Sequence, residues 1–266
     1  MNFVEENLIK MREKNPVIQC FTNNVVTNFT ANVLLSSGAS PIMSYCEEEA
    51  EEMQNIASAL LLNIGTLDKT TSDQMRFQAN ISKKTKIPVI IDPVGAGASK
   101  LRTNLSIELI NKANTKIIKG NSGEIAAING IIGKTRGVDA TISEESFTSK
   151  ITIETAKKFD CTVVTTGKID YISDGNRIAK IFNGSEMLQK ITGAGCSLGA
   201  LIGAFISVTD PFEAAISAVE FFNIAAEISE REKKFPGSFK IKLLDNLMKL
   251  NKETISKMKR VEINEI

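Results

Sequence analysis

Leu60-Leu61-Leu62-Asn63-Ile64 is a short run of mostly apolar residues that does not alternate with polar ones, and Val89-Ile90-Ile91-Asp92 repeats this pattern. Strands covered by helices on both faces have this composition. Amphipathic segments separate these runs from other β-rich runs, and repeated strand–helix units favour a mostly parallel sheet with right-handed crossovers. We therefore expect a three-layer α/β fold with the sheet in the middle.

The pattern on either side of these two runs predicts a series of parallel strands with a helix after most of them. The predicted strands are Val17–Phe21, Pro41–Met43, Ala59–Ile64, Val89–Asp92, Lys116–Lys119 and Thr162–Thr165. The predicted helices lie near Val25–Ser36, Glu47–Ser58, Thr70–Lys84, Leu101–Ala113 and Thr152–Phe159. No low-complexity linker or internal repeat interrupts the series, so we expect residues 1–266 to form one domain.

The second half of the chain departs from this alternation. Ile169–Ser173 and Arg177–Phe182 flank Asp174-Gly175-Asn176, a turn sequence that predicts an antiparallel hairpin at the sheet edge. A polar, strand-like stretch precedes Thr192. Beyond Thr192 the pattern is helical almost to the end, with breaks near Asp210-Pro211 and Phe235-Pro236-Gly237 and a lysine-rich terminal helix around Lys249–Arg260.

Composition narrows the classes of function. The 42% hydrophobic content of 266 residues can bury a sizeable core, and a net charge of +1 does not favour a nucleic-acid or membrane surface. The N-terminus lacks the features of a signal peptide, and the longest apolar stretch, around Leu198–Val208, is too short to span a bilayer, so we expect a cytoplasmic protein. The absence of histidine excludes Ser-His-Asp and Cys-His catalysis. Four widely spaced cysteines disfavour a zinc or dithiol site.

A glycine-rich junction at Thr192-Gly193-Ala194-Gly195-Cys196 precedes a long apolar helical pattern. Glycines at a helix start leave backbone N–H groups uncovered at the positive end of the helix dipole, where a phosphate or a developing oxyanion binds well. Cys196 places a thiol beside that position. A flexible loop before a buried helix is the alternative interpretation of the pentapeptide.

Polar residues also follow several predicted strands. The segments that follow these strands are Thr22–Asn28, Asn63–Thr66, Asp92–Gly97, Lys119–Glu124 and Thr165–Gly167. Ligands of open α/β sheets bind outside the carboxyl ends of the strands. The recurrence of such segments at one edge therefore predicts a binding site there.

Two of these segments contain candidate charged groups, each with a structural alternative. Asn121 and Glu124 have the spacing of a capping box, and Glu124 is also a candidate for Mg²⁺ binding through water. Asp92 precedes a proline, so it either forms a turn or helps to hold the same Mg²⁺. Lys119 is either solvated or neutralises phosphate charge.

The sequence lacks one common phosphate-binding motif and matches another only in an unfavourable context. Gly167-Lys168 is followed by Ile169 and lacks the first glycine of a P-loop, so that motif is absent. Gly193–Gly199 matches a glycine pattern of dinucleotide-binding folds, but it follows a hairpin and no strand–helix–strand unit comes after it. This context disfavours an NAD(P) enzyme.

Nearly the whole chain resembles the hydroxyethylthiazole kinases, a thiamine-salvage family of the ribokinase-like superfamily. The most specific match is Thr22-Asn23-Asn24-Val25-Val26-Thr27-Asn28-Phe29-Thr30-Ala31-Asn32. The other matching segments are Gly38–Met43, Leu62–Leu67, Asp92–Ala98, Lys119-Gly120-Asn121 with Glu124, Thr192–Cys196 and Gly237-Ser238-Phe239. The resemblance implies a ribokinase-like fold.

The resemblance also implies an activity and a set of site residues. The activity is ATP-dependent phosphorylation of the hydroxyl of 4-methyl-5-(2-hydroxyethyl)thiazole, with Mg²⁺, in a homotrimer whose active sites lie between subunits. The implied substrate contacts are Met43, Gly193, Asn23 and Val25, the implied ATP contacts are Lys119, Thr166 and Asn121, and the implied Mg²⁺ residues are Asp92 and Glu124. Lys119 stands where many relatives have arginine, so its charge persists without bidentate phosphate binding.

In-line phosphoryl transfer needs positioning and charge neutralisation more than covalent chemistry. We expect the amides of Gly193–Gly195 to hold the transferring phosphoryl group. Cys196 stands where most of the superfamily has an aspartate base. A helix N-terminus lowers a thiol pKa and a nearby triphosphate raises it, so we expect a weak base or a partner that orients the substrate hydroxyl.

Three other interpretations differ in the reaction that they predict. A related kinase would phosphorylate pyridoxal or hydroxymethylpyrimidine. An ATP-dependent NAD(P)H-hydrate dehydratase would release phosphate without phosphorylating an alcohol. A non-catalytic nucleotide-binding protein would bind ATP without turnover.

Overall fold

A central β-sheet runs through the computed structural model, which describes residues 2–131 and 144–266. The sheet has nine strands in the order β2-β1-β3-β4-β5-β6-β7-β8-β9. The strands are β1 (Val17–Phe21), β2 (Ser40–Ile42), β3 (Ala59–Asn63), β4 (Val89–Asp92), β5 (Thr115–Asn121), β6 (Thr162–Thr166), β7 (Asp170–Ser173), β8 (Arg177–Ile181) and β9 (Val261–Glu265). The pairs from β2 to β6 are parallel and those from β6 to β9 are antiparallel, as the predicted mostly parallel sheet requires.

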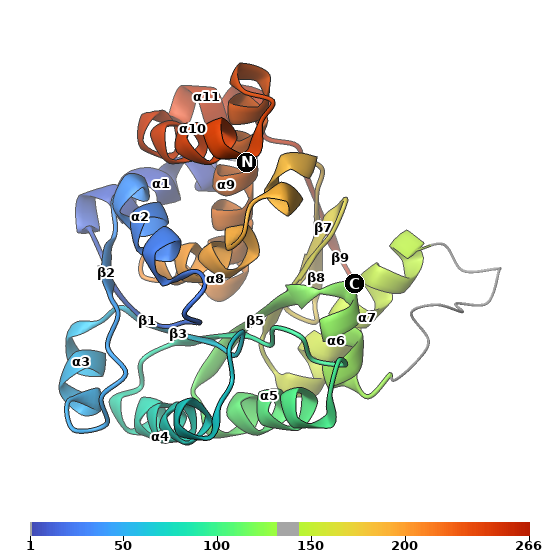
Figure 1. The fold of residues 1–266 in the computed structure, drawn as a ribbon. Coiled ribbons are helices and arrows are strands. Elements are labelled where there is room, and N and C mark those ends of the chain that lie inside the picture. The colour runs from blue at the N-terminus through green and yellow to red at the C-terminus, as the bar shows by residue number, and fades with distance from the viewer. Residues whose placement is uncertain (1, 132–143) are drawn as a thin grey trace.

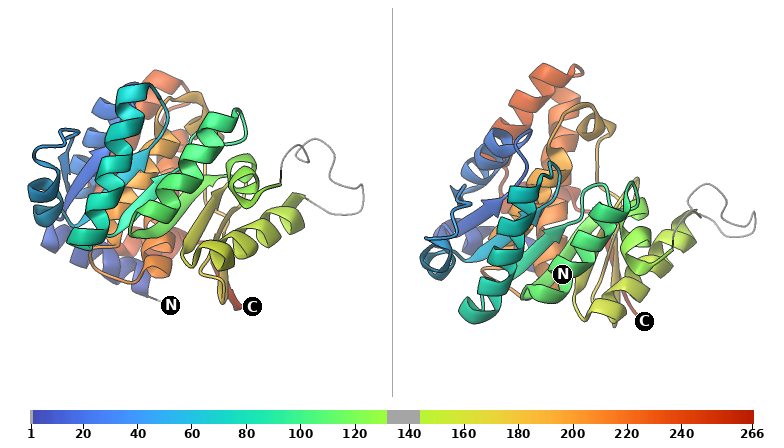
Figure 2. Two further views of the ribbon diagram at one scale, coloured as in Figure 1. Left: turned by 90° about the horizontal axis from the view of Figure 1, so that it is seen from below. Right: turned by 60° about the horizontal axis from the view of Figure 1, so that its bottom comes forward.

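Helices cover both faces of the sheet and complete the predicted three layers (Figure 1). The helices are α1 (Phe3–Lys14), α2 (Thr27–Ser37), α3 (Ala50–Ile56), α4 (Lys69–Thr85), α5 (Lys100–Lys112), α6 (Ser122–Asn129), α7 (Glu144–Phe159), α8 (Ala194–Phe205), α9 (Pro211–Glu232), α10 (Pro236–Lys249) and α11 (Lys252–Met258), with a 3₁₀ turn η1 (Glu186–Lys190). One buried apolar cluster joins α1, α2 and α8–α11 to the sheet, and a second joins α4–α7 to its other face. The view from below in Figure 2 shows α4 and α5 side by side across that second face.

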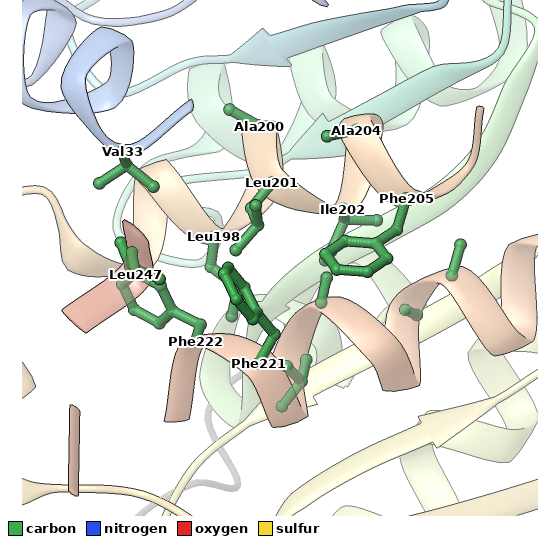
Figure 3. Packing of buried hydrophobic residues seen from close by; sticks show 14 of the residues in the cluster. Val33, Leu198, Ala200, Leu201, Ile202, Ala204, Phe205, Phe221, Phe222 and Leu247 are labelled. Carbon is green, nitrogen blue, oxygen red and sulfur yellow. The ribbon is translucent and has the colours of Figure 1, made fainter. Parts of the chain in front are cut away.

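Helix α8 is buried between the sheet and α9. Figure 3 shows Leu198, Leu201 and Phe205 of α8 facing Phe221 and Phe222 of α9. Glycines on α8 allow a close approach to the strands, since a Cβ at Gly199 would lie 3.1 Å from Leu61 Cδ1 and one at Gly203 would lie 3.3 Å from Ile18 Cγ2. This packing fixes the N-terminus of α8 over the carboxyl ends of the parallel strands.

The predicted hairpin and the two late helix breaks are confirmed. Strands β7 and β8 pair antiparallel around Gly175, whose φ of +92° suits glycine, and Asp174 Oδ1 accepts hydrogen bonds from the amides of Asn176 and Arg177. Asp210 caps α9 by accepting from the amides of Phe212 and Glu213, with a proline at the first helical position.

Two predictions for the C-terminal third were wrong. The stretch before Thr192 is the 3₁₀ turn η1 rather than a strand, because the Ser185 side chain caps it by accepting from the Met187 amide. The lysine-rich tail is not one helix: α10 ends at Lys249, Asn251 caps the short α11, and the chain then forms β9. Strand β9 pairs with β8, so the hairpin lies one strand inside the sheet edge.

Helix α1 is an element that the strand and helix pattern had not predicted. Its residues Val4, Leu8 and Met11 are buried against the α8–α9 side of the core, at a spacing that suits one face of a helix. Within the described residues, no helix combines the length and the apolar character needed to cross a membrane.

Candidate active site

A chain of amide and carboxylate groups joins the carboxyl ends of β1, β3 and β4. Asn23 Nδ2 donates to Asn63 Oδ1 at 2.8 Å, and Asn63 Nδ2 donates to Asp92 Oδ2 at 2.8 Å. Asn63 and Asp92 are register partners at the ends of neighbouring parallel strands, which explains why they meet. At the predicted edge of the sheet, the predicted substrate residue Asn23 and the predicted metal residue Asp92 therefore belong to one hydrogen-bond network.

Lys119, near the end of β5, is the partner of Asp92 on the other side. Its Nζ lies 3.4 Å from Asp92 Oδ2, and the two side chains are only 6% and 1% exposed. Burial raises the pKa of Asp92 to about 6, against the opposing effect of Lys119. Burial opposes the charged form of Lys119, but Asp92 and Glu124 outweigh it and raise the lysine pKa. Lys119 is thus a buried, fully charged ammonium rather than a solvated one.

The glycine junction forms the N-terminus of α8, directly beside Lys119. Gly193 is the N-cap with φ +94°, and a Cβ there would lie 3.0 Å from Val26 Cγ1. A Cβ at Gly195 would lie 3.3 Å from Lys119 Nζ. Both positions therefore favour glycine, the first for its backbone conformation and the second for its closeness to the ammonium.

Three backbone amides are available at this helix start. The amide of Ser197 makes the first intrahelical bond, to Gly193 O at 2.9 Å. The amides of Ala194, Gly195 and Cys196 have no acceptor within residues 2–131 and 144–266. Uncovered amides at the positive end of a helix, with an ammonium alongside, form a site for a phosphate or another oxyanion.

The capping box predicted for Asn121 and Glu124 is confirmed. Asn121 Oδ1 accepts from the Glu124 amide at 2.9 Å, and Glu124 Oε2 accepts from the Asn121 amide at 2.8 Å. Glu124 Oε1 also accepts from the Gly95 amide at 2.8 Å, which ties the loop after β4 to α6. Since backbone groups hold both carboxylate oxygens, we expect any Mg²⁺ contact of Glu124 to run through water, as the sequence interpretation proposed.

The donor set fits a Mg²⁺ ion that keeps most of its bound water. Asp92 Oδ1 is buried and has no hydrogen-bond partner, so it is an unsatisfied acceptor beside the anion site. In the described part of the chain, no group of three or more His, Cys, Asp or Glu side chains is arranged as a metal cage. Mg²⁺ typically binds through one or two carboxylates, with water and substrate phosphates supplying the other oxygens, and this arrangement suits that mode.

Cys196 lies close to Asn23, Asp92 and Lys119. Asn23 Nδ2 approaches its Sγ at 3.5 Å. Burial, and then the charge of Asp92, raise the pKa of the thiol, and they outweigh the opposing effect of Lys119. The thiol is therefore protonated at neutral pH, which favours the orienting role over that of a base.

A cavity of about 340 Å³ opens beside the α8 N-terminus, between α8, α9 and the strands β6 and β7. Its lining includes Asn121, Thr166 and Gly195, so two of the predicted ATP residues and a predicted catalytic glycine share one space. Thr166 Oγ1 donates to Gly120 O at 3.3 Å, which holds it at the end of β6. Lys119 is next to this cavity through Gly195.

The predicted substrate residues lie outside this cavity. Val25 is 64% exposed, and its amide donates to Asn23 Oδ1 at 3.2 Å. Met43 is half-buried and packs against the core cluster on the α2 side. On this side of the site, Val25 therefore presents its side chain mostly to solvent.

Three buried polar residues at the site had no predicted role. Asn63 begins the strand-end segment Asn63–Thr66, and its bonds to Asn23 and Asp92 explain why a polar residue ends an apolar strand. Asp170 and Asn223 line the cavity and are joined by a 2.7 Å hydrogen bond. A single asparagine within an otherwise apolar stretch of α9 was the available signal for Asn223.

Comparison with known proteins agrees with this geometry. The model of the hydroxyethylthiazole kinase family matches residues 8–253. The chain is 45% identical over 261 residues to hydroxyethylthiazole kinase from Pyrococcus abyssi, with 98% of each chain covered. A solved structure of hydroxyethylthiazole kinase protein from Pyrococcus horikoshii OT3 matches with a TM-score of 0.93 and 43% identity over 100% of both chains.

A more distant match bears on the fold alone. Pyridoxal kinase from Staphylococcus aureus, solved in complex with AMP-PCP and pyridoxal, has a TM-score of 0.61 at 16% identity and covers 94% of this chain and 98% of its own. The fold is therefore ribokinase-like, as predicted. Family membership rests on the full-length matches above 40% identity: the chain belongs to the hydroxyethylthiazole kinase family.

Proposed function

We propose that residues 1–266 act as one kinase domain that transfers a phosphoryl group from ATP to the hydroxyl of 4-methyl-5-(2-hydroxyethyl)thiazole. The product is the phosphate ester from which thiamine phosphate is made by salvage. The family supports the substrate and the reaction. The observation that carries the chemistry is the set of uncovered amides at the start of α8, with Lys119 Nζ beside Gly195.

The nucleotide occupies the cavity that Asn121 and Thr166 line, with its terminal phosphate at the α8 N-terminus. The uncovered amides of Ala194, Gly195 and Cys196 hold the transferring phosphoryl group, and Lys119 neutralises part of its charge. The substrate oxygen bonds to the γ-phosphorus, the bond to the β–γ bridging oxygen breaks with its electron pair staying on ADP, and the hydroxyl proton passes to solvent. Positioning and charge account for this catalysis, without a covalent intermediate.

Asp92 and Glu124 are the residues that hold Mg²⁺. Asp92 Oδ1 is the buried oxygen that lacks a partner, and Glu124 contributes through water because backbone amides occupy its oxygens. When bound, the ion supplies positive charge against the phosphate oxygens. Lys119 lies beside Asp92 Oδ2, and its positive charge favours the charged form of that carboxylate.

The substrate hydroxyl is oriented by Cys196 and Asn23. The protonated thiol and the Asn23 amide lie 3.5 Å apart, and both are close to the oxyanion site. Met43, Val25 and Gly193 line the thiazole side. Since Val25 is 64% exposed, we propose that a neighbouring subunit closes this side in a homotrimer. We place the enzyme in the cytoplasm, where its co-substrate ATP is available.

The deciding experiment incubates the purified protein with Mg·ATP and the thiazole alcohol and identifies products by mass. The expected result is one phosphate ester and one ADP for each alcohol consumed. Pyridoxal, hydroxymethylpyrimidine and NADH hydrate serve as competing substrates in the same assay. No thiazole ester at saturating alcohol and Mg·ATP, or a faster reaction with a competitor, would overturn the proposal.

A further inference from the structure

Asn223 is a buried asparagine that the proposed mechanism does not use. It lies on α9 between Phe222 and Ile224, is only 4% exposed, and lines the cavity beside α8. A buried amide without a function is costly unless its polar atoms are satisfied. The partners of Asn223 therefore indicate which of its atoms is left for a ligand.

The orientation of the Asn223 amide is fixed by two acceptors. Nδ2 donates to Asp170 Oδ2 at 2.7 Å and to the carbonyl oxygen of Asn183 at 2.8 Å. The other oxygen of Asp170 accepts from the Gly167 amide at 2.9 Å, so Asp170 cannot turn away without losing that bond. A rotation of the amide by 180° would place Oδ1 against two acceptors, which excludes the flipped orientation.

The carbonyl oxygen of Asn223 is the remaining atom. It accepts no hydrogen bond from residues 2–131 or 144–266, although its side chain lines the cavity. The Asp170–Asn223–Asn183 arrangement thus presents one oriented acceptor to whatever fills the cavity.

The cavity itself has an apolar part and a polar part. Leu188, Leu198 and Phe222 supply apolar walls near Asn223, and Figure 3 shows Leu198 and Phe222 on the facing helices α8 and α9. Gly195 and Thr166 stand at the polar part, where the proposed function places the phosphates. Apolar walls with one fixed acceptor suit an aromatic ring that carries an amino group.

We propose that Asn223 Oδ1 accepts a hydrogen bond from the 6-amino group of adenine and so selects adenine nucleotides over 6-oxopurine nucleotides. A 6-oxo group would place an acceptor against Oδ1 and leave both atoms unpaired. The inference rests on the proposed function, because it takes this cavity as the site of the phosphate donor.

The first test compares kcat/KM for ATP and ITP, which differ at position 6 and in protonation of the adjoining N1. We expect ATP to be favoured by about tenfold or more in the unaltered protein. Asn223→Ala should bring the ratio close to one, mostly through KM for ATP. Because both nucleotides are measured on one preparation, partial unfolding lowers both rates and leaves the ratio unchanged. Asn246→Ala removes an asparagine that is equally buried but does not line the cavity, and should keep the ratio.

A second variant tests the orientation directly. In Asp170→Asn, the new amide retains an acceptor for Gly167 N and presents a donor to Asn223 Nδ2, so that of the two acceptors only the Asn183 carbonyl still favours the original orientation of Asn223. We expect the preference for ATP over ITP to shrink. Equal kcat/KM for ATP and ITP in the unaltered protein, or an unchanged ratio in both cavity variants, would overturn the inference. A large loss with 2′-deoxyATP and none with ITP would assign Oδ1 to the ribose and overturn it too.

Direct binding separates this inference from the proposed function. Calorimetric titration with ADP and IDP requires no turnover, and ADP should bind about tenfold more tightly. Tighter ADP binding without any ester product would refute the thiazole reaction and leave the role of Asn223 standing. Ester formation with equal binding of ADP and IDP would support the thiazole reaction and refute the role of Asn223.

Discussion

Asn63 donates its amide to Asp92 Oδ2 at 2.8 Å, which leaves Oδ1 as the only oxygen of Asp92 without a partner. The side-chain carbonyl of Asn63 accepts from Asn23, so Asn63 links the orientation of Asp92 to that of Asn23. A residue with no proposed contact to either substrate thereby sets the orientation of Asp92 and Asn23 together.

Asn63→Ala is expected to lower kcat by about 10- to 100-fold, because it frees Asp92 to rotate and leaves Asn23 without its acceptor. KM for ATP should change less, since the α8 amides are untouched. Steady-state kinetics measure both. Asn114→Ala is the control: its side chain bonds Lys86 O and Ile87 O before β4, so it should cost stability and not kcat. Equal kcat in Asn63→Ala and the unaltered protein would contradict this role.

Gly195→Ala is expected to reduce kcat/KM for ATP by about tenfold or more, because the new methyl would meet Lys119 Nζ at 3.3 Å and displace the ammonium from the phosphate site. Gly203→Ala adds the same methyl to the same helix, 3.3 Å from Ile18 and away from Lys119. That variant should lower Tm while keeping kcat/KM. If both variants lost activity in proportion to Tm, the effect of Gly195 would be one of stability alone.

Cys196→Ser is expected to keep kcat within about tenfold of the unaltered protein, since a hydroxyl also orients the substrate oxygen. Burial and Asp92 raise the thiol pKa, so the rate should not track thiol ionisation. Profiles of kcat from pH 6 to 10 should therefore have the same shape in both proteins. A rate that climbs with pH only when the cysteine is present would instead assign it the role of a base, and Cys196→Asp would then exceed Cys196→Ser.

Glu220 predicts a pH dependence of stability. Burial raises its pKa to about 8, with a further rise from Glu227 and opposing effects from the Arg260 amide and the charges of Arg260 and Lys259. Between the unfolded pKa of 4.5 and the folded value of about 8, the folded protein binds more protons at this residue, so its contribution to stability falls as pH rises. Above pH 8 the folded protein holds a buried carboxylate whose Oε2 has no partner.

Glu220→Gln removes this titration while keeping the shape of the side chain. The variant should match the unaltered protein at pH 5 and exceed its Tm at pH 9 by roughly 5 °C or more. Thermal unfolding followed by circular dichroism at the two pH values measures the difference. A Tm gap of the same size at both pH values would mean that the glutamate stays in one protonation state.

The sequence predicts the buried half of this fold well, because β3 and β4 are apolar at nearly every position and such strands have few alternatives. It predicts β9 poorly. Val261 and Ile263 offer only two apolar positions, and their partner strand β8 is about 80 residues earlier in the chain, so no local pattern reports the pairing. The 3₁₀ turn η1 was missed because one serine cap outweighed a polar pattern.

The site residues likewise include some that the sequence predicted and one that it did not. The rule that ligands bind at strand ends brought Asn23, Asp92 and Lys119 to one edge, and the hydrogen bonds between them confirm that placement. The sequence did not predict a role for Asn223, because the orientation of its amide depends on Asp170. Asp170 is 53 residues away in the chain and contacts Asn223 only in the folded protein. Roles carried by the resemblance, such as those of Met43 and Val25, stay predictions.

The last strand has a consequence for the wall of the cavity beside α8. The amide of Arg260, just before β9, donates to Asn183 Oδ1 at 2.7 Å, and the carbonyl of the same asparagine accepts from Asn223. Pairing of β9 with β8 therefore holds Arg260 against Asn183 and, through Asn183, helps to hold the Asn223 amide. A local opening of β9 would loosen this wall while leaving the α8 N-terminus and Lys119 in place.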